Sequence, residues 1–424
     1  MRWLSVVGIG EDGLEGLSPA ARSLVETAEL LIGGARHLAM VPEGRAERDA
    51  WERPLDRSIE RIARHRGRRV VVLASGDPLW YGIGTTLARH FRREEMTILP
   101  QPGAFSLAAA RLLWPLDDCV LLTLHGRPLD TVRLHLAPGR RLLILSENGA
   151  TPREVARLLD ELGWGESRVE VLAHLGGTDE AAFCAEAQDW GDRLVPDLNT
   201  MAVTCEAGSA ARPLPRIAGL PDDAFEHDGQ LTKREVRAAT LAALAPLPGE
   251  RLWDVGAGCG SVAIEWLRLL DGREAVAIER NEERAAIIAR NAARLGVPGL
   301  RVVCAEAPAA LAGLPHPQAV FIGGGVGTEG LLWAAWEALG PGGRLVANVV
   351  TTEGEAEVFD WQRRHGGTLS RIAVSRAEPT GGIERRHIWR PLATVTQFAA
   401  TKAAPHPSPL PALRGEGGSR GAEG

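Results

Sequence analysis

Lysine, tyrosine and cysteine are all scarce in this sequence. Only Lys233 and Lys402 are lysines among the 48 basic residues, and tryptophan outnumbers tyrosine by 12 to 1. We attribute this bias mainly to codon usage, although arginine also suits bidentate contacts with carboxylates and phosphates. The formal net charge is only −6, which argues against a dedicated nucleic-acid binder with a large basic face.

The five cysteines are too scattered to form a recognisable site. They are Cys119, Cys184, Cys205, Cys259 and Cys304. No two of them have the Cys-x-x-Cys spacing of zinc ligands, a disulfide framework is excluded as well, and a reducing compartment fits best. The N-terminus shows no signal-peptide pattern, and no apolar run approaches the roughly 18 residues that span a bilayer. We therefore expect a cytoplasmic protein with no metal site and no membrane partner.

Length and composition indicate a globular α/β protein of two or three domains. The chain has 424 residues, of which 45% are hydrophobic and 24% charged. Short β-branched runs alternate with helical patterns, which is typical of parallel or mixed α/β sheets. The first such stretch covers 1–113 and the second 114–205, and we expect them to be two lobes of one domain, 1–205.

The remaining chain is expected to hold a linker, a second domain and a tail. Residues 206–228 contain several glycines and prolines, which predicts a linker. A Rossmann-like α/β domain is predicted over 229–398. Residues 399–424 are of low complexity and cannot bury enough apolar surface to order themselves, so disorder is expected there.

Several helix starts carry capping signals. Ser18 followed by Pro19 predicts a cap and a proline at the first helical position. Thr151 and Thr232 each precede a glutamate by three residues, which is the capping-box pattern. For Thr232 two interpretations stay open, a helix cap only or a cap that also touches a ligand.

The clearest chemical signal lies in the third α/β stretch. A predicted strand over 251–255 runs directly into a glycine-rich turn and then a helix. The residues of this turn are Gly256, Ala257, Gly258, Cys259 and Gly260. The glycines permit a sharp turn and the close approach of a ligand, and a second predicted strand ends at Glu279, whose carboxylate can accept both hydroxyls of a ribose. This combination predicts a nucleoside-cofactor site.

The glycine spacing favours one kind of cofactor. A dinucleotide fingerprint reads G-x-G-x-x-G and leaves room for a pyrophosphate. Here the pattern is G-x-G-x-G, a shorter loop that suits a ligand without phosphates. S-adenosylmethionine is therefore favoured over NAD, and an NAD-dependent oxidoreductase is disfavoured. Ala307 follows the next predicted strand, where an adenine would lie.

Two regions of the chain resemble known methyltransferase families. Residues 225–395 are similar to the class I methyltransferases that methylate carbon 15 of a precorrin and decarboxylate it. The similarity rests on the stretches 232–237, 254–261, 277–281, 307–311 and 321–324. The N-terminal lobes resemble the tetrapyrrole methylases, which are class III methyltransferases. That similarity rests on 7–10, 76–82, 102–106 and 124–127. The order of the two domains resembles a family of fused precorrin methyltransferases of cobalamin biosynthesis.

The resemblance implies a function for each half. The N-terminal domain, with the two-lobed tetrapyrrole methylase fold, would methylate carbon 5 of precorrin-6B (6Y). The C-terminal domain would methylate carbon 15 and remove carbon dioxide from the ring C acetate, giving precorrin-8X. One molecule of S-adenosylmethionine would bind in each domain. Because both families often assemble, we also expect a homo-oligomer.

The resemblance also implies the cofactor contacts. In the C-terminal domain they fall on Thr232, Gly256 to Gly260, Glu279 and Ala307. In the N-terminal domain the cofactor would lie between the lobes. Its contacts there would be Gly8, Gly10, Gly76, Asp77, Pro78, Tyr81 and Gly82. Asp77 has an alternative role as the cap of a helix after Pro78. Cys259 stands where the family often has Thr, and Glu11-Asp12 departs from the family pattern, which weakens any contact of Asp12.

The chemistry does not require a nucleophilic side chain. The methyl group of the cofactor is already activated and the meso carbons of a reduced tetrapyrrole are electron-rich, so the protein mainly has to align the reactants in a dry site. No catalytic residue can be named from the sequence. Because the substrate carries many carboxylates, arginines should line both clefts. The candidates are Arg127, Arg385 and Arg386.

Two other functions fit parts of the sequence. A two-domain RNA methyltransferase would share both folds, but it would need a basic stripe or an RNA-binding appendage, and neither is evident. We therefore expect no nucleic-acid partner. A regulatory protein that binds S-adenosylmethionine without turnover would share the cofactor site. Release of S-adenosylhomocysteine in the presence of a precorrin would exclude it.

Overall fold

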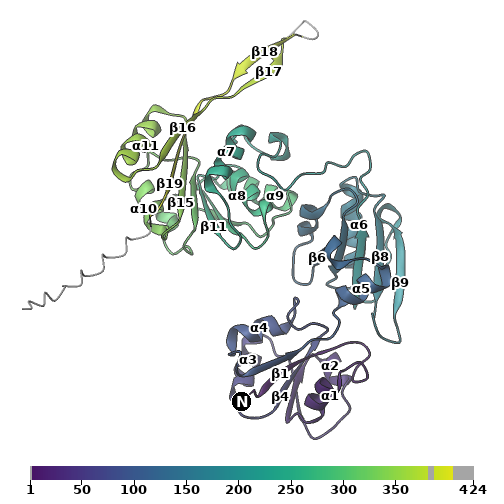
Figure 1. Cartoon of the computed structure of the whole chain (residues 1–424). Coiled ribbons are helices and arrows are strands. Elements are labelled where there is room, and N and C mark those ends of the chain that lie inside the picture. The colour runs from purple at the N-terminus through teal and green to yellow at the C-terminus, as the bar shows by residue number, and fades with distance from the viewer. Residues whose placement is uncertain (1, 381–385, 404–424) are drawn as a thin grey trace, which may run out of the picture. The chain divides into compact units, whose positions relative to one another are not determined.

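The computed structural model describes residues 2–380 and 386–403 and divides the chain into two compact units (Figure 1). Unit 1 is Met1–Leu214 and unit 2 is Pro215–Gly424. Unit 1 contains two sheets, and unit 2 contains one larger sheet and a two-stranded hairpin. The predicted α/β class is confirmed for both. Among the helices of the described ranges, none is long and apolar enough to cross a membrane.

The first lobe of unit 1 is built on a five-stranded parallel sheet in the order β3-β2-β4-β1-β5. The strands are β1 Leu4–Ile9, β2 Leu30–Gly33, β3 Glu47–Ala50, β4 Val70–Ser75 and β5 Met96–Leu99. The central strands β1 and β4 are almost continuous apolar runs, because both faces of a parallel sheet are covered. The helices are α1 Pro19–Glu26, α2 Ala35–Ala39, α3 Leu55–Arg64 and α4 Ile83–His90. As predicted, Ser18 caps α1, and its hydroxyl accepts the Ala21 N–H at 3.3 Å.

The second lobe holds a mixed sheet in the order β6-β7-β10-β8-β9. Its strands are β6 Cys119–Thr123, β7 Arg141–Leu145, β8 Arg168–Ala173, β9 Ala181–Glu186 and β10 Asn199–Thr204. Two α-helices, α5 Ala104–Leu112 and α6 Thr151–Glu161, pack on it. The prediction that Thr151 caps α6 is wrong. Thr151 is the first helical residue, and its hydroxyl accepts the N–H groups of Glu147 and Asn148 instead.

Unit 2 is built on a seven-stranded sheet in the order β13-β12-β11-β14-β15-β19-β16. Its strands are β11 Arg251–Val255, β12 Glu274–Glu279, β13 Arg301–Cys304, β14 Ala319–Ile322, β15 Arg344–Val349, β16 Thr368–Ile372 and β19 Val395–Thr401. The first five are parallel, and β19 and β16 add an antiparallel edge. The strand order reverses between β11 and β14, and open α/β sheets bind their ligands beyond the carboxyl ends of the strands at such a point.

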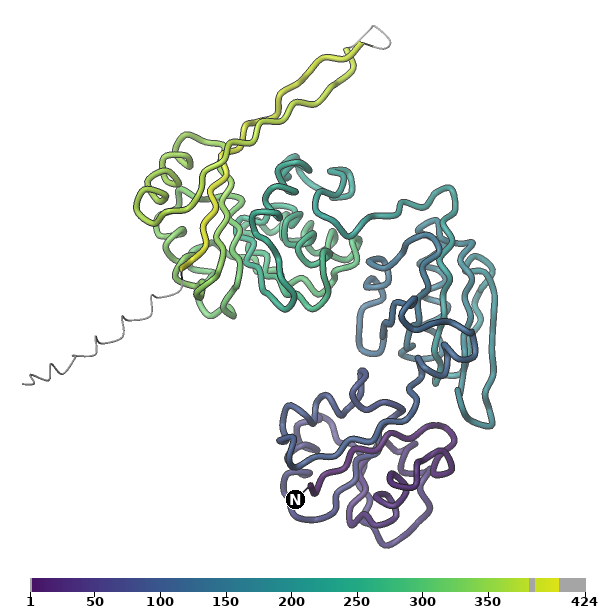
Figure 2. Tube along the Cα trace, in the orientation of Figure 1, coloured from purple at the N-terminus to yellow at the C-terminus, as the bar shows by residue number. Residues whose placement is uncertain are grey.

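Helices cover both faces of this sheet (Figures 1 and 2). They are α7 Arg234–Leu244, α8 Ser261–Leu269, α9 Glu282–Arg294, α10 Leu331–Ala338 and α11 Thr352–His365. Alternate strand residues such as Trp253 and Val255 belong to the core that packs against α10 and α11. Because neighbouring residues of a strand point to opposite faces, Asp254 lies on the side of α8. The hairpin of β17 Ser375–Pro379 and β18 His387–Pro391 extends beyond the sheet (Figure 2).

The structure corrects two predicted boundaries. Residues 206–228 are not a free linker, because the backbone of Gly208 bonds to Gly163 of unit 1, whereas Leu220 and Phe225 are buried in unit 2. The predicted tail begins too early, since β19 continues to Thr401 and pairs there with β15. Composition alone does not reveal that Leu220 and Phe225 are buried or that β19 pairs with β15. The rest of the predicted tail, 404–424, lies outside the described residues.

Candidate functional site

The glycine turn of unit 2 lies at the reversal of strand order, directly after β11. Gly256, Gly258 and Gly260 have φ values of +68°, +61° and +79°, a left-handed backbone that other residues rarely adopt. A Cβ at Gly256 would lie 2.9 Å from the carbonyl oxygen of Gly324, and one at Gly260 would lie 2.8 Å from Ile288. These two glycines therefore permit close packing of the turn onto its neighbours.

Gly258 differs, because it faces open space. A Cβ there would meet only the Gln230 carbonyl oxygen, at 3.9 Å, among the atoms of the described residues within 4 Å. The N–H of Gly258 donates to a carboxylate oxygen of Glu279 at 2.9 Å, and the other oxygen accepts the Asn281 N–H at 3.0 Å. Each carboxylate oxygen retains a further lone pair, so the ribose hydroxyls of a nucleoside could still be accepted.

Of the other predicted contacts, Ala257 and Cys259 lie in this turn and Ala307 follows β13. Ala257 donates its N–H to Ile278 at 3.1 Å, and Ala307 is half-buried against the core of unit 2. The Cys259 side chain is buried, and burial raises the pKa of its thiol to about 11, so it stays protonated and is a poor nucleophile. The open face at Gly258 and the free acceptor capacity of Glu279 fit the predicted nucleoside cofactor.

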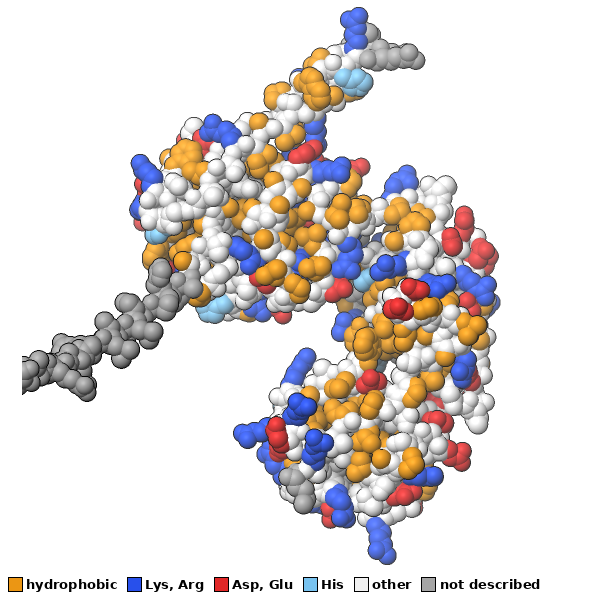
Figure 3. Space-filling view, in the orientation of Figure 1, with side chains coloured by type: hydrophobic (Ala, Val, Ile, Leu, Met, Phe, Trp, Pro, Cys, Tyr) orange, Lys and Arg blue, Asp and Glu red, His pale blue; other side chains and the backbone are white. Residues whose placement is uncertain are grey.

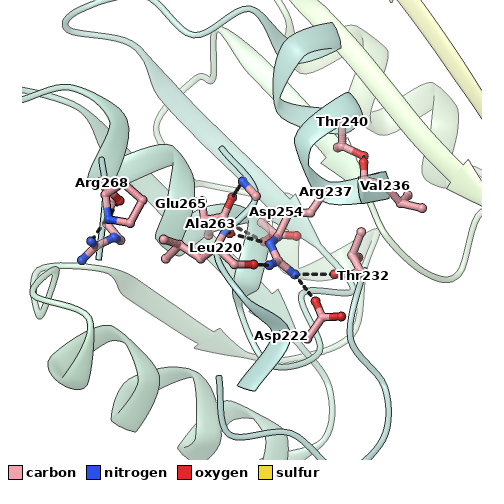
Figure 4. Close-up of polar contacts among 12 residues, drawn as sticks. Leu220, Asp222, Thr232, Val236, Arg237, Thr240, Asp254, Ala263, Glu265 and Arg268 are labelled. Atoms are coloured by element: carbon pink, nitrogen blue, oxygen red, sulfur yellow. Dashed lines mark hydrogen bonds and ion pairs between the residues drawn. The ribbon is translucent and has the colours of Figure 1, made fainter. Parts of the chain in front are cut away.

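Thr232 is held by its backbone, and the prediction that it caps α7 is wrong. The N-cap of that helix is Lys233, which makes no side-chain cap. The Thr232 carbonyl instead accepts a hydrogen bond from the Arg237 guanidinium at 2.5 Å (Figure 4). Thr232 lies two residues after Gln230, whose carbonyl oxygen faces Gly258. The Arg237 contact therefore holds the segment 230–232 beside the glycine turn.

Arg237 belongs to a buried ionic network that no pattern in the sequence indicates (Figure 4). Its Nε donates to Glu265 at 2.6 Å, and both side chains are fully buried. Other guanidinium nitrogens reach the Leu220 carbonyl and, at 3.3 Å, Asp222. Glu265 also accepts the N–H groups of Gly219 and Leu220 at 2.7 and 2.8 Å. The pair thus fixes the chain around Gly219 and Leu220, which precedes α7.

Asp254 is the other buried ionisable group under the turn. One carboxylate oxygen accepts the Ala263 N–H at 2.9 Å near the start of α8, and the other has no partner among the described residues. Burial raises the pKa of Asp254 from 3.8 to about 7, the Ala263 bond opposes this, and the Glu279 carboxylate adds to it. The folded protein therefore favours the protonated acid below about pH 7.

Replacing Asp254 by asparagine tests this assignment. Because the folded-state pKa is above the unfolded one, the folded state holds an extra proton between about pH 4 and 7, and its stability falls as the pH rises through that window. Asp254→Asn cannot ionise. It is expected to gain roughly 1–4 kcal/mol over wild type as the pH rises from about 5 to about 8, measured by urea unfolding of unit 2. Asp223→Asn, at an exposed site, is the control. An Asp254→Asn difference that does not change with pH would contradict the assignment.

In unit 1, the predicted glycines bring backbone segments together at the carboxyl ends of β1 and β4. A Cβ at Gly8 would lie 1.9 Å from the Gly76 carbonyl oxygen, and one at Gly76 would lie 2.7 Å from Gly103. Gly10 faces the Asp12 carboxylate instead. The predicted contacts include Gly8, Gly10 and Gly76 but not Gly103, although Gly103 belongs to the 102–106 stretch on which the family resemblance rests.

The loop between β4 and α4 carries an unusual run of exposed apolar residues. Leu79, Trp80 and Tyr81 are 53%, 52% and 47% exposed. Tyr81 has a left-handed backbone with φ of +54°, and its hydroxyl donates to the Leu121 carbonyl at 3.3 Å. The guanidinium carbon of Arg127 lies 5.2 Å from the centre of the Tyr81 ring. The structure thus joins two predicted residues, Tyr81 and Arg127, beside an apolar surface.

Asp77, Pro78 and Gly82 shape this loop. Asp77 does not cap the following helix, because α4 begins at Ile83 and Asp77 accepts the Leu79 N–H at 2.9 Å. That alternative is therefore wrong, and the Asp77 side chain stabilises a local turn. A Cβ at Gly82 would lie 2.5 Å from the Pro78 carbonyl oxygen, so Gly82 lets the loop close on itself.

Of the two predicted substrate arginines of unit 2, the structure describes Arg386, which is not part of the glycine turn. Arg386 is exposed and directly precedes β18 of the hairpin, and its carbonyl accepts the Thr380 N–H at 2.9 Å. Arg385 lies outside the described residues. Within the described ranges, no group of three or more His, Cys, Asp or Glu side chains is placed to hold a metal ion.

Comparison with known proteins finds relatives that match 94% of this chain. A sequence profile described as "Precorrin methyltransferase domain" matches residues 223–402, and one described as "Tetrapyrrole (Corrin/Porphyrin) Methylases" matches residues 4–189. A curated relative from Sinorhizobium sp., named precorrin-6Y C(5,15)-methyltransferase (decarboxylating), is 51% identical over 94% of this chain and 96% of its own. A relative of the same name from Mycobacterium tuberculosis (strain CDC 1551 / Oshkosh) is 42% identical over 94% and 99%. A crystal structure described as the C-terminal domain of precorrin-6Y C5,15-methyltransferase from Rhodobacter capsulatus is 46% identical, covers 45% of this chain and 100% of its own, and has a TM-score of 0.42.

Proposed function

Since the chain belongs to the family of decarboxylating precorrin-6Y C(5,15)-methyltransferases, we propose that it methylates a precorrin at carbons 5 and 15 and removes carbon dioxide from the ring C acetate. The chain is an S-adenosylmethionine-dependent methyltransferase of the cobalamin pathway. The substrate is precorrin-6Y and the product is precorrin-8X. This proposal rests on one observation. Both units, in the same order along the chain, match relatives that are covered over nearly their full length.

We assign one reaction to each unit. Unit 1 methylates carbon 5, and unit 2 methylates carbon 15 and directs the decarboxylation. The position of the precorrin methyltransferase profile at 223–402 and of the tetrapyrrole methylase profile at 4–189 supports this division. A substitution that inactivates only unit 2 is expected to abolish carbon 15 methylation and the release of carbon dioxide. Carbon 5 methylation should be retained.

Each unit is proposed to hold its own cofactor. When bound, S-adenosylmethionine supplies a methyl group that is already activated for transfer. In unit 2, Glu279 would accept the ribose hydroxyls, Gly258 would let the backbone approach, and Thr232 and Ala307 would flank the nucleoside. In unit 1, the backbone segments after β1 and β4 would form the second site.

The residues of the chain orient the substrate and exclude water rather than form covalent bonds. In unit 1 the apolar Leu79 and Trp80 side chains offer a surface for one face of a macrocycle. Arg127, placed beside Tyr81, can pair with a peripheral carboxylate of the substrate. Alignment of this kind lowers the barrier by positioning, which can contribute roughly 7–11 kcal/mol in favourable cases.

Arg127→Ala tests the substrate role. An exposed charge-assisted contact with a carboxylate is lost, so the KM for the precorrin in carbon 5 methylation is expected to rise about tenfold, with the KM for S-adenosylmethionine almost unchanged. Steady-state kinetics with each substrate varied in turn measures this. Arg89→Ala, at an exposed site on α4, is the control. Equal increases in both KM values would refute the role of Arg127 in substrate binding.

We further propose a cytoplasmic homo-oligomer without a nucleic-acid partner. Ile388 and Trp389 on the hairpin are 41% and 74% exposed, which favours association, and Figure 3 shows hydrophobic side chains along it. Light scattering of the full chain tests the oligomer. The alternative of a two-domain RNA methyltransferase is opposed by the net charge of −6. Turnover to S-adenosylhomocysteine that depends on a precorrin and not on RNA would exclude both it and a purely regulatory binding protein.

A further inference from the structure

A cluster of ionisable side chains lies at the carboxyl end of the parallel sheet of unit 1, and the function described above does not use it. Glu11 follows β1, Arg36 and His37 lie on α2 after β2, and Ser75 ends β4. His174 joins them from the second lobe, immediately after β8. Because open α/β sheets bind ligands beyond the carboxyl ends of their strands, this cluster borders the proposed site of unit 1.

Glu11 links the two lobes through its carboxylate. One oxygen pairs with the Arg36 guanidinium, and the other lies 3.0 Å from Nδ1 of His174. The Glu11 side chain is 17% exposed, and that of His174 is 31% exposed. A carboxylate can only accept, so Nδ1 of His174 carries the hydrogen and Nε2 holds a lone pair. Among the described residues, Nε2 has no hydrogen-bond partner, so it is free to act as a base.

His37 does not share this property. Its Nε2 lies 2.9 Å from an Arg36 guanidinium nitrogen and 3.0 Å from the Ser75 hydroxyl. Burial and the Arg36 charge lower the pKa of His37 to about 4. The ring therefore stays neutral and its acceptor nitrogen is occupied. Of the two histidines in the cluster, only His174 combines a carboxylate partner with a free nitrogen.

The backbone of His174 is held in an unfavourable conformation. Its φ is +50°, in the left-handed region where a residue with a Cβ is strained. The N–H donates to the Leu198 carbonyl at 3.0 Å, and the carbonyl accepts the Gly177 N–H at 2.9 Å. A Cβ on Gly177 would lie 2.8 Å from Glu11, so a glycine at that position permits the close approach of the two loops. This arrangement favours a specific role for the His174 side chain.

We propose that His174, oriented by Glu11, is the general base that removes the hydrogen from carbon 5 after methylation in unit 1. The proposal rests on the proposed function. A meso carbon carries one hydrogen. The new bond joins carbon 5 to the methyl carbon, and the electron pair of the broken sulfur–methyl bond stays on sulfur. The bond between carbon 5 and its hydrogen then breaks, its electron pair restores the conjugation of the ring system, and the proton passes to Nε2 of His174 and on to solvent.

The same group should catalyse an exchange that needs no methyl donor. In deuterated water, a protonated His174 can deliver a deuteron to the electron-rich carbon 5 and then remove the original proton. The wild-type full chain, given precorrin-6Y and S-adenosylhomocysteine, is expected to exchange the carbon 5 hydrogen for deuterium. NMR or mass spectrometry measures the rate of this exchange. His174→Gln is expected to lower that rate by about 100-fold or more, and Glu11→Gln by less, because the base is then present but poorly oriented.

Carbon 15 methylation and carbon dioxide release serve as internal controls for folding, and His90→Gln, at an exposed site on α4, as the matched control. In His174→Gln, the rate of carbon 5 methylation is expected to fall together with the exchange rate. The two reactions of unit 2 and the affinity of unit 1 for S-adenosylhomocysteine are expected to stay unchanged. Exchange and carbon 5 methylation within about twofold of wild type, or a loss explained by weaker cofactor binding, would overturn the role of His174. Absence of carbon 5 methylation in wild type would instead overturn the proposed function.

Discussion

Replacement of Arg237 by methionine is expected to destabilise unit 2 by about 3–5 kcal/mol, because it leaves the Glu265 carboxylate buried without its counter-charge. The guanidinium also satisfies the carbonyl groups of Leu220 and Thr232, which lose their partner in the variant. Since Thr232 borders the glycine turn, the affinity of unit 2 for S-adenosylhomocysteine should fall together with the stability. Urea unfolding and calorimetric titration measure the two effects.

A matched pair of variants separates the network from helix α7 as a whole. Arg234→Ala removes an exposed arginine of the same helix and should change the unfolding free energy by less than about 0.5 kcal/mol. Arg237→Met combined with Glu265→Leu should cost less than the sum of the single changes, because the second removes the unpaired charge. A cost for Arg237→Met as small as that for Arg234→Ala would show that the buried pair does not hold this part of unit 2.

Glu279→Ala is expected to have the largest effect on cofactor binding. The change removes the acceptor for the ribose hydroxyls and the anchor of the Gly258 N–H. Hydrogen bonds to a charged group contribute roughly 1.5–3 kcal/mol each, so the affinity of unit 2 should fall by about 100-fold or more. In titrations of the full chain with S-adenosylhomocysteine, the number of tight sites should drop from two to one.

The control for this titration is Glu283→Ala, which changes an exposed glutamate on α9, the helix that follows the same strand. It should leave both sites intact. Two tight sites in Glu279→Ala would place the nucleoside elsewhere in unit 2. A single site in wild type would argue against one cofactor in each unit.

Much of the fold around the glycine turn could be predicted from the sequence. The sequence predicts the strand from Arg251 to Val255 at its observed bounds, because the strand runs directly into the glycine-rich turn that ends it. The turn itself follows from the glycine spacing, and Glu279 from its place at the end of the next strand. Caps were predicted less well. The Thr151 and Thr232 patterns match the capping box, yet neither residue caps its helix, because side-chain spacing alone does not fix where the first turn begins.

The sequence could not predict the antiparallel strands β16 to β18, which are mostly exposed and lack an apolar pattern. It could not predict the polar pairs either. Glu11 and His174 are 163 positions apart in the chain, and Arg237 and Glu265 are 28 apart, so their contact depends on the tertiary fold. For the same reason, the sequence could not tell that Arg127 contacts Tyr81 whereas Arg386 is exposed on the hairpin.

The division of labour between the two units is tested most directly by the product that the Glu279→Ala full chain forms from precorrin-6Y and S-adenosylmethionine. Mass spectrometry, with NMR to locate the new methyl group, reads the outcome. Wild type should add two methyl groups and release one molecule of carbon dioxide. The variant should add a single methyl group, at carbon 5, and release none. A variant product that carries a methyl group at carbon 15, or that has lost carbon dioxide, would contradict the assignment of these reactions to unit 2.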